Sequence, residues 1–429
     1  MAATKLKRPW WAFALTAIVT AIAVVISLNF VTPETRIDAA PKRLYSLQDP
    51  QFRRAINSLL GPPIVAGNKV ETLRNGDEIF PAMLAAIRDA KESIDFETYV
   101  YWSGQIGRDF GNAIAERARA GVKTNVLLDW AGSQRMDKDV IETMKSAGAR
   151  VELYHPLRWY TLARMNNRTH RKLLIVDGKV GFTGGVGIAE EWTGQAQDPQ
   201  HWRDTHFRIE GPVVANMQAT FQDNWIKVTG EVSHGSDYYP PLAPAGQSDA
   251  QMFQSSPSGG SESMELLYLM AINASDHTID LEAAYFIPDK IAIDALIAAR
   301  RRGVDVRIIV PGPHNDASVT RYASRSAWGP LLAAGIKIFE YQPTMFHCKV
   351  LTVDGLLSSV GSTNFDDRSF RLNDEASLNV FDPEFAALQR RVFEEDLSAS
   401  REYTLADWNA RPWTQRFKEW ASSTVQSQL

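Results

Sequence analysis

A short pattern that occurs twice constrains the fold of this chain more than any other feature. Each copy reads His-x-Lys, four further residues, then Asp-Gly, at 170–178 and at 347–355. The four residues after each Lys are apolar or β-branched, which predicts a strand. Side chains two apart on a strand share a face, so His170 should project with Lys172, and His347 with Lys349. Two imidazoles and two ammonium groups gathered at one place would form a phosphate site.

The sequence around the pattern also repeats. Strands expected over 93–100 and 122–129 return at 278–282 and 304–310, and the helix between each pair ends at a glycine. The nearly equal spacing indicates an internal duplication. Because strands alternate with helices, we expect an α/β fold of two duplicated α/β/α lobes packed about a pseudo-twofold axis.

The duplication suggests where the lobes begin and end. We expect a first lobe over 44–232, and a second lobe with an aromatic C-terminal tail over 262–429. Residues 233–261 are rich in Pro, Gly and Ser, which is typical of a linker or a long surface loop. In the tail, Trp413, Phe417 and Trp420 recur at helical spacing. Packing on the body is our main expectation for this aromatic face, with membrane contact as the alternative.

The N-terminal residues 1–43 predict a short cytoplasmic segment, a membrane anchor over about 10–31 and a connector. The run from Trp10 to Val31 is uncharged and largely apolar, which is long enough to span a bilayer as a helix. We favour an uncleaved anchor over a signal peptide, because no good small-residue cleavage site lies near its end. Lys5, Lys7 and Arg8 favour a cytoplasmic N-terminus, but basic residues also follow the span, so the side of the body stays open.

Composition narrows the classes of partner. The net charge of −4 and the pI near 6.1 lack the basic footprint of a nucleic-acid-binding protein. The one cysteine, Cys348, cannot form an internal disulfide, and the eight histidines include no His-Glu-x-x-His pattern. We therefore expect neither a metal nor another cofactor.

The paired motifs would support chemistry on a phosphodiester. The lysines would neutralise the non-bridging oxygens. One neutral imidazole would attack phosphorus, forming a phosphohistidine, while the other would protonate the leaving alcohol and then deprotonate the incoming nucleophile. Such a division of labour needs two histidines on opposite sides of one phosphorus, which a pseudo-twofold interface can provide.

Each motif also contains an aspartate, Asp177 or Asp354, which we include among the candidate site residues. Each lies five positions beyond its Lys, so a straight strand would point it away from the His and Lys. Its place before a glycine indicates a turn role.

The two copies resemble the paired HKD motifs of the phospholipase D superfamily. The runs 167–172, 202–206, 340–347 and 361–375 resemble bacterial cardiolipin synthases in particular, and the resemblance covers roughly 68–420. It implies two similar α/β lobes with the site between them, no metal, and a phosphohistidine intermediate. It also implies that His170 attacks and that His347 acts as acid and base, with swapped roles left open.

The resemblance also implies further site residues. Ser362 and Asn364, in Gly-Ser-x-Asn, are similar to the phosphate-contacting residues of the family, and Glu375 matches the carboxylate that bonds a motif histidine. Such a carboxylate fixes the tautomer of the imidazole. Asp204 is our candidate for the same task on His170. The first half departs from the family in carrying Gly187 where Asn is common, so the half-sites should hold phosphate unequally.

The implied activity is that of a membrane-anchored phosphatidyltransferase. It would join two phosphatidylglycerols into cardiolipin plus glycerol, with the bilayer as partner and a bacterial-type inner membrane as its location. One alternative is a phospholipase D, which would release phosphatidic acid. Less favoured alternatives are a metal-independent nuclease, against which the low pI argues, and a lipid-binding scaffold that would keep its function after His170→Ala.

Overall fold

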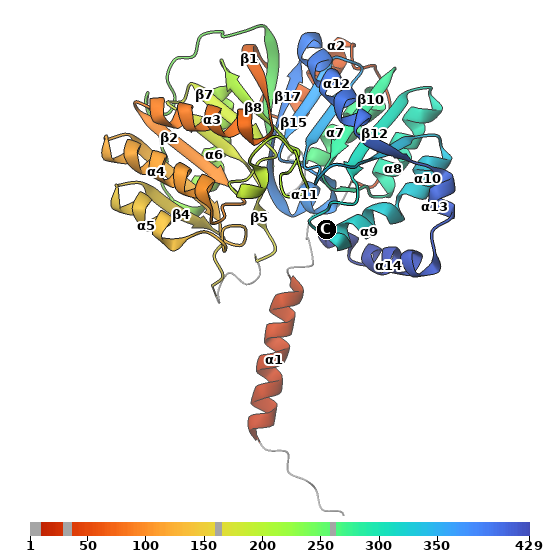
Figure 1. Cartoon of the computed structure of the whole chain (residues 1–429), viewed down its shortest axis with the longest axis horizontal. Helices are drawn as coiled ribbons and strands as arrows, with labels where there is room; N and C mark the ends of the chain where they lie inside the picture. Colours follow the sequence, from red (N-terminus) through yellow and green to blue (C-terminus); the bar gives the residue numbers. More distant parts are fainter. Residues whose placement is uncertain (1–9, 29–36, 159–164, 258–262) are drawn as a thin grey trace, which may run out of the picture.

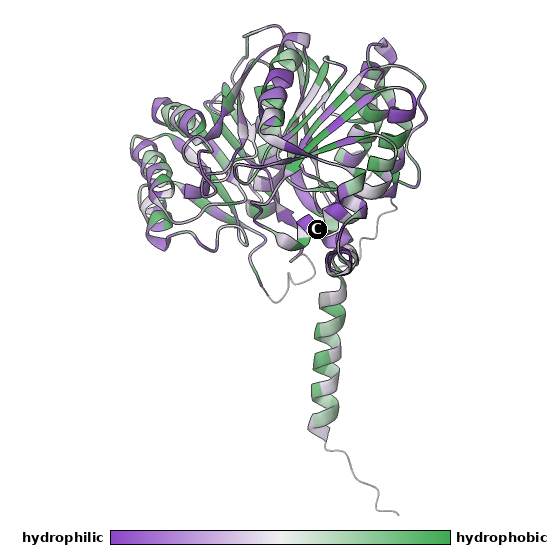
Figure 2. Cartoon of the chain, turned by 45° about the vertical axis from the view of Figure 1, so that its right-hand side comes forward, coloured by the Kyte–Doolittle hydropathy of each residue, from purple (hydrophilic) through white to green (hydrophobic). Residues whose placement is uncertain are grey.

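The computed structural model describes residues 10–28, 37–158, 165–257 and 263–429. Helix α1 (Trp10–Leu28) extends from a rounded body built on one large sheet with helices on both faces (Figure 1). The ribbon of α1 is coloured largely as hydrophobic (Figure 2). Among the helices built from these described residues, none has both the length and the hydropathy that a membrane crossing requires. The expected cytoplasmic residues 1–9 and the end of the expected span, 29–31, lie outside the described part of the chain.

The first half of the chain forms one half of the sheet. Its strands lie in the order β1-β8-β7-β6-β2-β3-β4, with β2, β3 and β4 parallel. They span β1 (Val65–Arg74), β8 (Thr205–Glu210), β7 (Val180–Gly184), β6 (Leu173–Val176), β2 (Ser93–Thr98), β3 (Lys123–Asp129) and β4 (Arg150–Tyr154). Alternate residues of β3 and β6 join two different cores, so both faces of the sheet are covered. One face carries α3 (Asn75–Asp89), α4 (Gln105–Arg119) and α5 (Lys138–Ser146), and the other carries α6 (Val214–Thr229).

The second half repeats this arrangement in the order β9-β17-β15-β14-β10-β12-β13, with β18 added at the edge. Its strands are β9 (Ser248–Ser255), β17 (Asn373–Phe381), β15 (Leu357–Gly361), β14 (Lys349–Val353), β10 (Thr278–Ala283), β12 (Asp305–Pro311), β13 (Lys337–Tyr341) and β18 (Ser400–Tyr403). One face carries α7 (Met264–Ala274), α8 (Lys290–Arg301) and α10 (Trp328–Ala333), and the other carries α12 (Pro383–Ser398). The expected duplication of an α/β lobe is therefore confirmed.

The two lobes share one sheet. β1 pairs antiparallel with β9, so the strand order runs unbroken from β18 to β4. One hydrophobic core spans the joint, because Leu173 and Phe207 of the first lobe are clustered with Met252 and Leu378 of the second. The lobes are consequently held together by buried apolar surface and backbone hydrogen bonds.

Two expected boundaries were wrong. The segment 233–261, expected to be a linker or loop, contains β9, whose inward residues Ala250 and Met252 are fully buried in the shared core. Polar residues alternate with them, which hid the strand in a segment rich in turn formers. Helix α2 (Pro50–Leu59) was assigned to the first lobe, but its Phe52 and Ile56 are buried in the core of the second.

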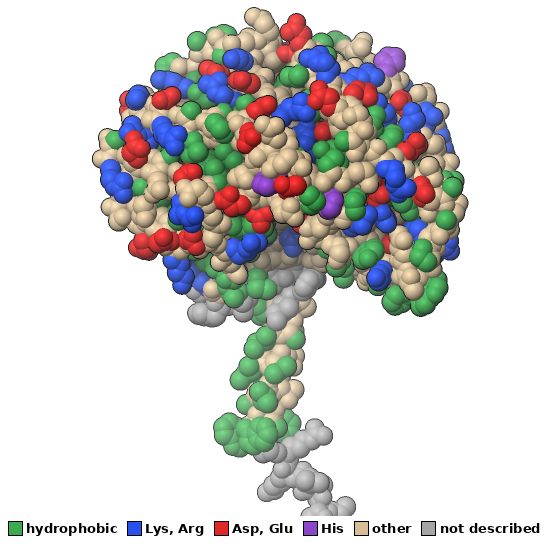
Figure 3. Space-filling model, in the orientation of Figure 1, with side chains coloured by type: hydrophobic (Ala, Val, Ile, Leu, Met, Phe, Trp, Pro, Cys, Tyr) green, Lys and Arg blue, Asp and Glu red, His purple; other side chains and the backbone are tan. Residues whose placement is uncertain are grey.

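The C-terminal part adds short elements around the body. These are α9 (Ser318–Ser326), α11 (Asp367–Arg371), α13 (Leu405–Asn409), α14 (Trp413–Ser423) and the 3-10 turn η3 (Gln426–Gln428). Helix α14 packs on α9, yet its aromatic side chains face outward: Trp413 is 76% exposed, Phe417 57% and Trp420 63%. Our main expectation, that this face packs on the body, was wrong. Hydrophobic side chains accordingly cover the surface over α14 at the lower right of Figure 3.

Candidate active site

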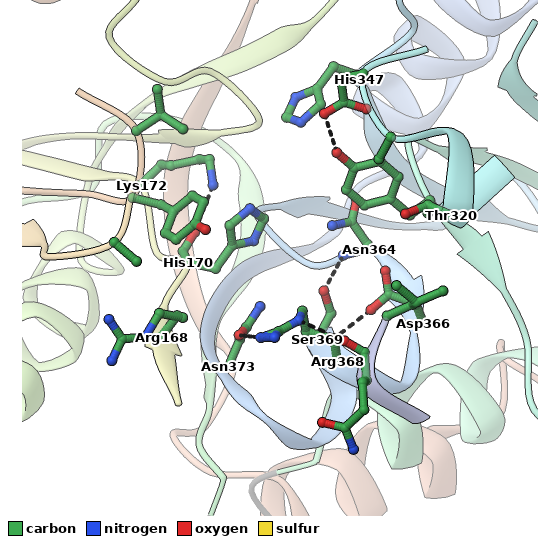
Figure 4. Close-up of a pocket in the computed structure, with 18 of the residues that line it drawn as sticks. Arg168, His170, Lys172, Thr320, His347, Asn364, Asp366, Arg368, Ser369 and Asn373 are labelled. Carbon is green, nitrogen blue, oxygen red and sulfur yellow. Dashed lines mark hydrogen bonds between the residues drawn. The ribbon is translucent and has the colours of Figure 1, made fainter. Parts of the chain in front are cut away.

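A pocket of about 510 Å³ lies where the two lobes meet, and both motif histidines line it (Figure 4). The first lobe contributes Tyr99, Trp102, Arg168, His170, Lys172, Trp192 and Trp202. The second lobe contributes Tyr285, Thr320, His347, Asn364, Asp366, Arg368, Ser369 and Asn373. The two copies of the motif, which are far apart in sequence, therefore face a common cavity.

Backbone pairing across the lobe boundary places each histidine. The strand β5 (Arg168–Thr169) runs parallel to the start of β17, and the amide of His170 donates to the carbonyl of Asp374 at 2.8 Å. In the other lobe, the amide of His347 donates to the carbonyl of Arg203 at 2.8 Å. His170 and Lys172 lie in the stretch directly before β6, and His347 lies two residues before the first residue of β14, Lys349. Of the four motif residues only Lys349 lies within a strand, so the expectation that each His and Lys lies on a strand was wrong for the other three, which precede the strands β6 and β14.

Each histidine is bonded to a carboxylate of the other lobe. Nδ1 of His170 lies 2.9 Å and 3.0 Å from the two carboxylate oxygens of Glu375. Nδ1 of His347 lies 2.7 Å from the carboxylate of Asp204. Our assignment of Asp204 to His170 was wrong. Each motif reaches across the boundary, so the carboxylate nearest in sequence is not the one nearest in space.

The environment of these pairs fixes their protonation. Burial alone would raise the pKa of Glu375 and of Asp204, but the paired histidine, the nearby motif lysine and a further hydrogen bond together outweigh it, and both pKa values are lowered. Ionised carboxylates only accept hydrogen bonds, so Nδ1 of each imidazole is the donor. Nε2 of His347 lies 3.2 Å from Nζ of Lys349, whereas Nε2 of His170 has no hydrogen-bond partner among the described residues. Burial lowers the pKa of His170 to about 4, against the opposing effect of Glu375, and it also lowers the pKa of His347. At neutral pH His170 is therefore a neutral imidazole with its Nε2 lone pair available.

The two motif lysines supply positive charge beside the histidines. Nζ of Lys172 donates to the carbonyl of His170 at 2.9 Å, and Nζ of Lys349 donates to that of His347 at 2.8 Å. Burial lowers the pKa of both, that of Lys172 to about 7. A bound anion would raise the pKa values of both lysines again, because its negative charge stabilises the ammonium groups that burial deprives of water.

The residues beside the carboxylates differ between the lobes. In the second lobe the hydroxyl of Ser362 donates to Glu375, and Asn364 lines the pocket. The first lobe has Gly185 and Gly187 in the corresponding positions. A Cβ on Gly185 would lie 2.2 Å from Asp204 Oδ1, and one on Gly187 would lie 2.7 Å from Cβ of Val100.

A tryptophan takes over part of this role in the first lobe. Nε1 of Trp192 donates to Asp204 at 2.9 Å, and the ring of Trp192 would meet a Cβ on Gly187 at 3.2 Å. Trp192 thus occupies the space that an asparagine would need, which gives the unequal half-sites a steric cause.

The two motif aspartates lie outside the pocket. The carboxylate of Asp177 accepts hydrogen bonds from the amides of residues 91–93, at the start of β2. The carboxylate of Asp354 accepts from the amides of residues 276–278, at the start of β10. Both aspartates have positive φ, 54° and 51°. Their position fits the turn role, and they hold the loops that lead into β2 and β10.

Several aromatic residues that we did not single out enclose the histidines. The ring of Tyr99 packs edge-on against His170 at 5.3 Å, and Trp192 and Trp202 lie 5.3 Å and 5.5 Å from His347. Tyr285 faces His347 at 6.4 Å. The repeat contained a signal for the tyrosines, because Tyr99 lies at the end of the strand expected over 93–100 and Tyr285 follows the corresponding strand expected over 278–282.

Within the described residues, one group of side chains has the donors for a metal ion. Glu282, Cys348 and Asp396 approach one another in the interior. Arg203 already forms an ion pair with Asp396 at 2.7 Å. Burial raises the pKa of Glu282 and of Cys348 well above their usual values, which keeps both protonated. These donors fit a buried ion-pair network better than a metal site.

Comparisons with known proteins agree with this geometry. A family model described as "Cardiolipin synthase, PLD-like domain" matches residues 83–225 and 268–397, one match in each lobe. The chain is 36% identical to the probable cardiolipin synthase YwiE of Bacillus subtilis, over 82% of this chain and 70% of that protein. It is 33% identical to cardiolipin synthase A of Pseudomonas syringae, over 82% of this chain and 73% of that protein.

The fold also has a solved counterpart. The phosphatidylserine synthase of Haemophilus influenzae superposes with a TM-score of 0.65 at 15% identity, covering 88% of this chain and all of that one. At this identity the likeness concerns the fold alone. The sequence matches over both lobes establish the relationship, and the chain belongs to the phospholipase D-like family of cardiolipin synthases.

Proposed function

We propose that the protein is a phosphatidyltransferase that joins two phosphatidylglycerols into cardiolipin and glycerol. The observation that carries the proposal is the crossed arrangement of the site: His170 with Glu375 and His347 with Asp204, in one pocket with both motif lysines. The arrangement provides two separately oriented imidazoles, as transfer through a covalent intermediate requires.

In the first step, Nε2 of His170 attacks the phosphorus of the donor lipid. The P–N bond forms, the P–O bond to the glycerol headgroup breaks, and Nε2–H of His347 protonates the departing glycerol oxygen. The low pKa of His170, about 4, supports its role as the neutral nucleophile. The bound phosphodiester anion raises the pKa of His347, so that this imidazole becomes the proton donor.

In the second step, the primary hydroxyl of another phosphatidylglycerol enters. His347, now neutral, takes the proton of that hydroxyl, and the oxygen attacks phosphorus while the P–N bond to His170 breaks. Cardiolipin leaves and both imidazoles return to their starting state. The ammonium groups of Lys172 and Lys349 offset the charge on the non-bridging oxygens in both steps.

Arg368 supports a second anionic lipid as the acceptor. Its guanidinium lines the pocket and donates to Asn166 and to the carbonyl of Gln428. No carboxylate among the described residues forms an ion pair with it. The positive charge of Arg368 in this pocket would attract the phosphate group of an acceptor phosphatidylglycerol. A water molecule has no net charge and would not be attracted in this way.

Helix α1 supports attachment of the body to the membrane that holds the substrate. Its large apolar side chains are exposed, including Trp10 at 81%, Phe13 at 63% and Leu15 at 54%. Such a surface is unfavourable in water and favourable among lipid chains. A single pass with a cytoplasmic N-terminus is the specific form of this proposal. Resistance of the full chain to carbonate extraction would support attachment by α1, and release by carbonate would contradict it.

The activity is tested with the purified full chain and vesicles of phosphatidylglycerol labelled in the headgroup and in the acyl chains. In buffer containing EDTA, we expect labelled cardiolipin and free glycerol in equal amounts. Phosphatidic acid as the main product would indicate a hydrolase instead. Cleavage of DNA with no lipid product would indicate a nuclease. Turnover of neither lipid nor DNA would indicate a non-enzymatic lipid-binding scaffold.

A matched pair of histidine variants separates chemistry from folding. His170→Ala should abolish both products, because it removes the nucleophile. His234 is exposed and does not line the pocket, so His234→Ala should leave turnover unchanged. Equal turnover by wild type and His170→Ala would overturn the proposal.

A further inference from the structure

Helix α14 has its polar side turned inward and its aromatic side turned outward. Glu419 is only 2% exposed, pairs with Arg411, and accepts a hydrogen bond from Gln415 at 2.8 Å. The large side chains Trp413 and Trp420 face solvent. A helix that lies against a protein in water normally does the reverse. An exposed apolar face of this size marks a surface that another phase or molecule covers.

The charges of the helix indicate what covers it. Arg416 and Lys418 are exposed on the same helix, whereas its one acidic side chain, Glu419, is buried and paired. Arg416 donates to the carbonyl of Asn409, Lys418 lies over the ring of Tyr322, and neither has a carboxylate partner within the described part of the chain. An aromatic face on a helix whose exposed cations lack carboxylate partners among the described residues matches the headgroup region of an anionic bilayer.

The position of α14 connects it to the pocket. It packs on α9, and Thr320 of α9 lines the pocket on the other side of that helix. Residues Gln428 and Leu429 of the C-terminal segment also line the pocket. In Figure 1, α9, α14, the C-terminus and α1 all lie on the same side of the body. A membrane that touches α14 would therefore face the region through which a lipid headgroup enters.

We propose that the aromatic face of α14, formed by Trp413, Phe417 and Trp420, inserts into the headgroup region of a bilayer rich in anionic phospholipid. The contact holds the pocket entrance at the level of the headgroups, so that lipids reach the histidines without leaving the membrane. This orienting role rests on the proposed function, whereas the lipid contact itself does not depend on the reaction.

The contact is tested by a fluorescent label on the full chain. Cys348, the one native cysteine, is fully buried, so a thiol-reactive, polarity-sensitive dye will label Phe417→Cys selectively. With phosphatidylglycerol vesicles that contain a lipid-borne quencher, we expect a blue shift and strong quenching. Arg391→Cys on α12 is the control, because it is exposed and α12 lies on the opposite side of the body (Figure 1).

Three outcomes decide the proposal. Quenching at position 417 but not at 391 supports it, and an equal response at both positions overturns it. A label at 417 that is already shielded before vesicles are added overturns it as well, because a second copy of the chain then covers the face. Quenching at 417 in a preparation that turns over no lipid supports the contact while the proposed function fails.

A second variant tests the role of the face in turnover. Replacing Trp413, Phe417 and Trp420 together by Ser changes only exposed side chains, so we expect the fold to be kept. Activity on vesicles should fall at least tenfold, while activity on a short-chain, monomerically dissolved phosphatidylglycerol should stay the same. Equal activity of this variant and wild type on vesicles would overturn the orienting role.

Arg416→Gln combined with Lys418→Gln should abolish any preference of the protein for anionic over zwitterionic vesicles. A retained preference would overturn the electrostatic part of the proposal.

Discussion

The Nδ1 atom of His170 lies 2.9 Å from a carboxylate oxygen of Glu375, although the two residues are 205 positions apart and belong to different lobes. His347 and Asp204, which are 143 positions apart, are paired in the same crossed way at 2.7 Å. The tautomer and the orientation of each imidazole are consequently set by a carboxylate of the opposite lobe.

Glu375→Gln should lower kcat by on the order of 10²–10⁴-fold. The amide keeps the size of the side chain but loses the charge that makes Nδ1 of His170 the donor and stabilises positive charge on the ring. Turnover of labelled phosphatidylglycerol by the variant measures the effect. A change of less than threefold would show that the carboxylate does not control His170.

The corresponding change in the other pair, Asp204→Asn, separates the roles of the two histidines. With a p-nitrophenyl phosphodiester, the leaving group needs no proton, so impaired acid catalysis by His347 should no longer slow the first step. We expect this substrate to rescue the burst of nitrophenol in Asp204→Asn but not in Glu375→Gln. The opposite pattern would assign attack to His347 and proton transfer to His170.

The pH dependence of kcat/KM should reflect Lys172. Burial lowers its pKa to about 7 in the free enzyme, so the ammonium loses its proton as the pH rises through this value. Binding of the phosphate needs the charged form, and kcat/KM should therefore fall above pH 7. The pKa of His170 is about 4, so protonation of the nucleophile should reduce the rate only near that lower pH.

The variant Lys172→Arg provides the control for this profile. Arginine stays protonated across the whole accessible range, so the fall of kcat/KM on the alkaline side should move to higher pH even if the maximum rate is lower. If kcat/KM of this variant falls at the same pH as that of the wild type, a group other than Lys172 causes the fall.

Asp354→Asn should reduce stability and leave the chemistry intact. The carboxylate accepts hydrogen bonds from the amides of Asp276, His277 and Thr278 at 2.7–2.9 Å. An amide side chain can replace these only in part, so we expect the free energy of unfolding to fall by about 1–3 kcal/mol. Urea unfolding measures this loss, and Asp38→Asn at an exposed position is the control. A large loss of kcat with unchanged stability would place Asp354 in the reaction after all.

Gly187→Asn, which restores the residue common in the family, should destabilise the protein. A Cβ at this position meets Val100 at 2.7 Å and Trp192 at 3.2 Å, and overpacking of this kind costs about 1–3 kcal/mol. Thermal unfolding should show a lowered Tm with no gain in turnover. Gly230→Asn is the matched control, because the space around Gly230 is open and Asn tolerates its left-handed backbone, φ 73°. A raised kcat in Gly187→Asn would contradict the steric explanation.

The sequence-based predictions succeeded where the information is local or repeated. The His-x-Lys spacing, the alternation of strands and helices, and the duplication together predict two α/β lobes that bring His170 and His347 to one pocket, as the structure has them. The family resemblance added Glu375 and Asn364, which also lie at this pocket or bond its histidines.

The errors share a physical cause, because each depends on which surfaces meet in the folded chain. Asp204 was given to His170 from distance along the chain, but the peptide before each histidine pairs with the other lobe. The strand β9 was hidden because polar residues, including the buried Gln251, interrupt its apolar ones in a segment rich in turn formers. The helical spacing of Trp413 and Phe417 indicated that they share a face of the helix. The spacing does not show whether that face points toward the body or toward solvent.

The crossing of the two His–carboxylate pairs has a consequence for the origin of the protein. A single-lobe ancestor could not have completed either pair alone, but two copies joined edge to edge through the strand equivalent to β1 would have completed both at once. Gene fusion would then have had only to connect the two copies of such a dimer. Once the copies were linked, each could diverge: one came to use Glu375 with Ser362, and the other Asp204 with Trp192.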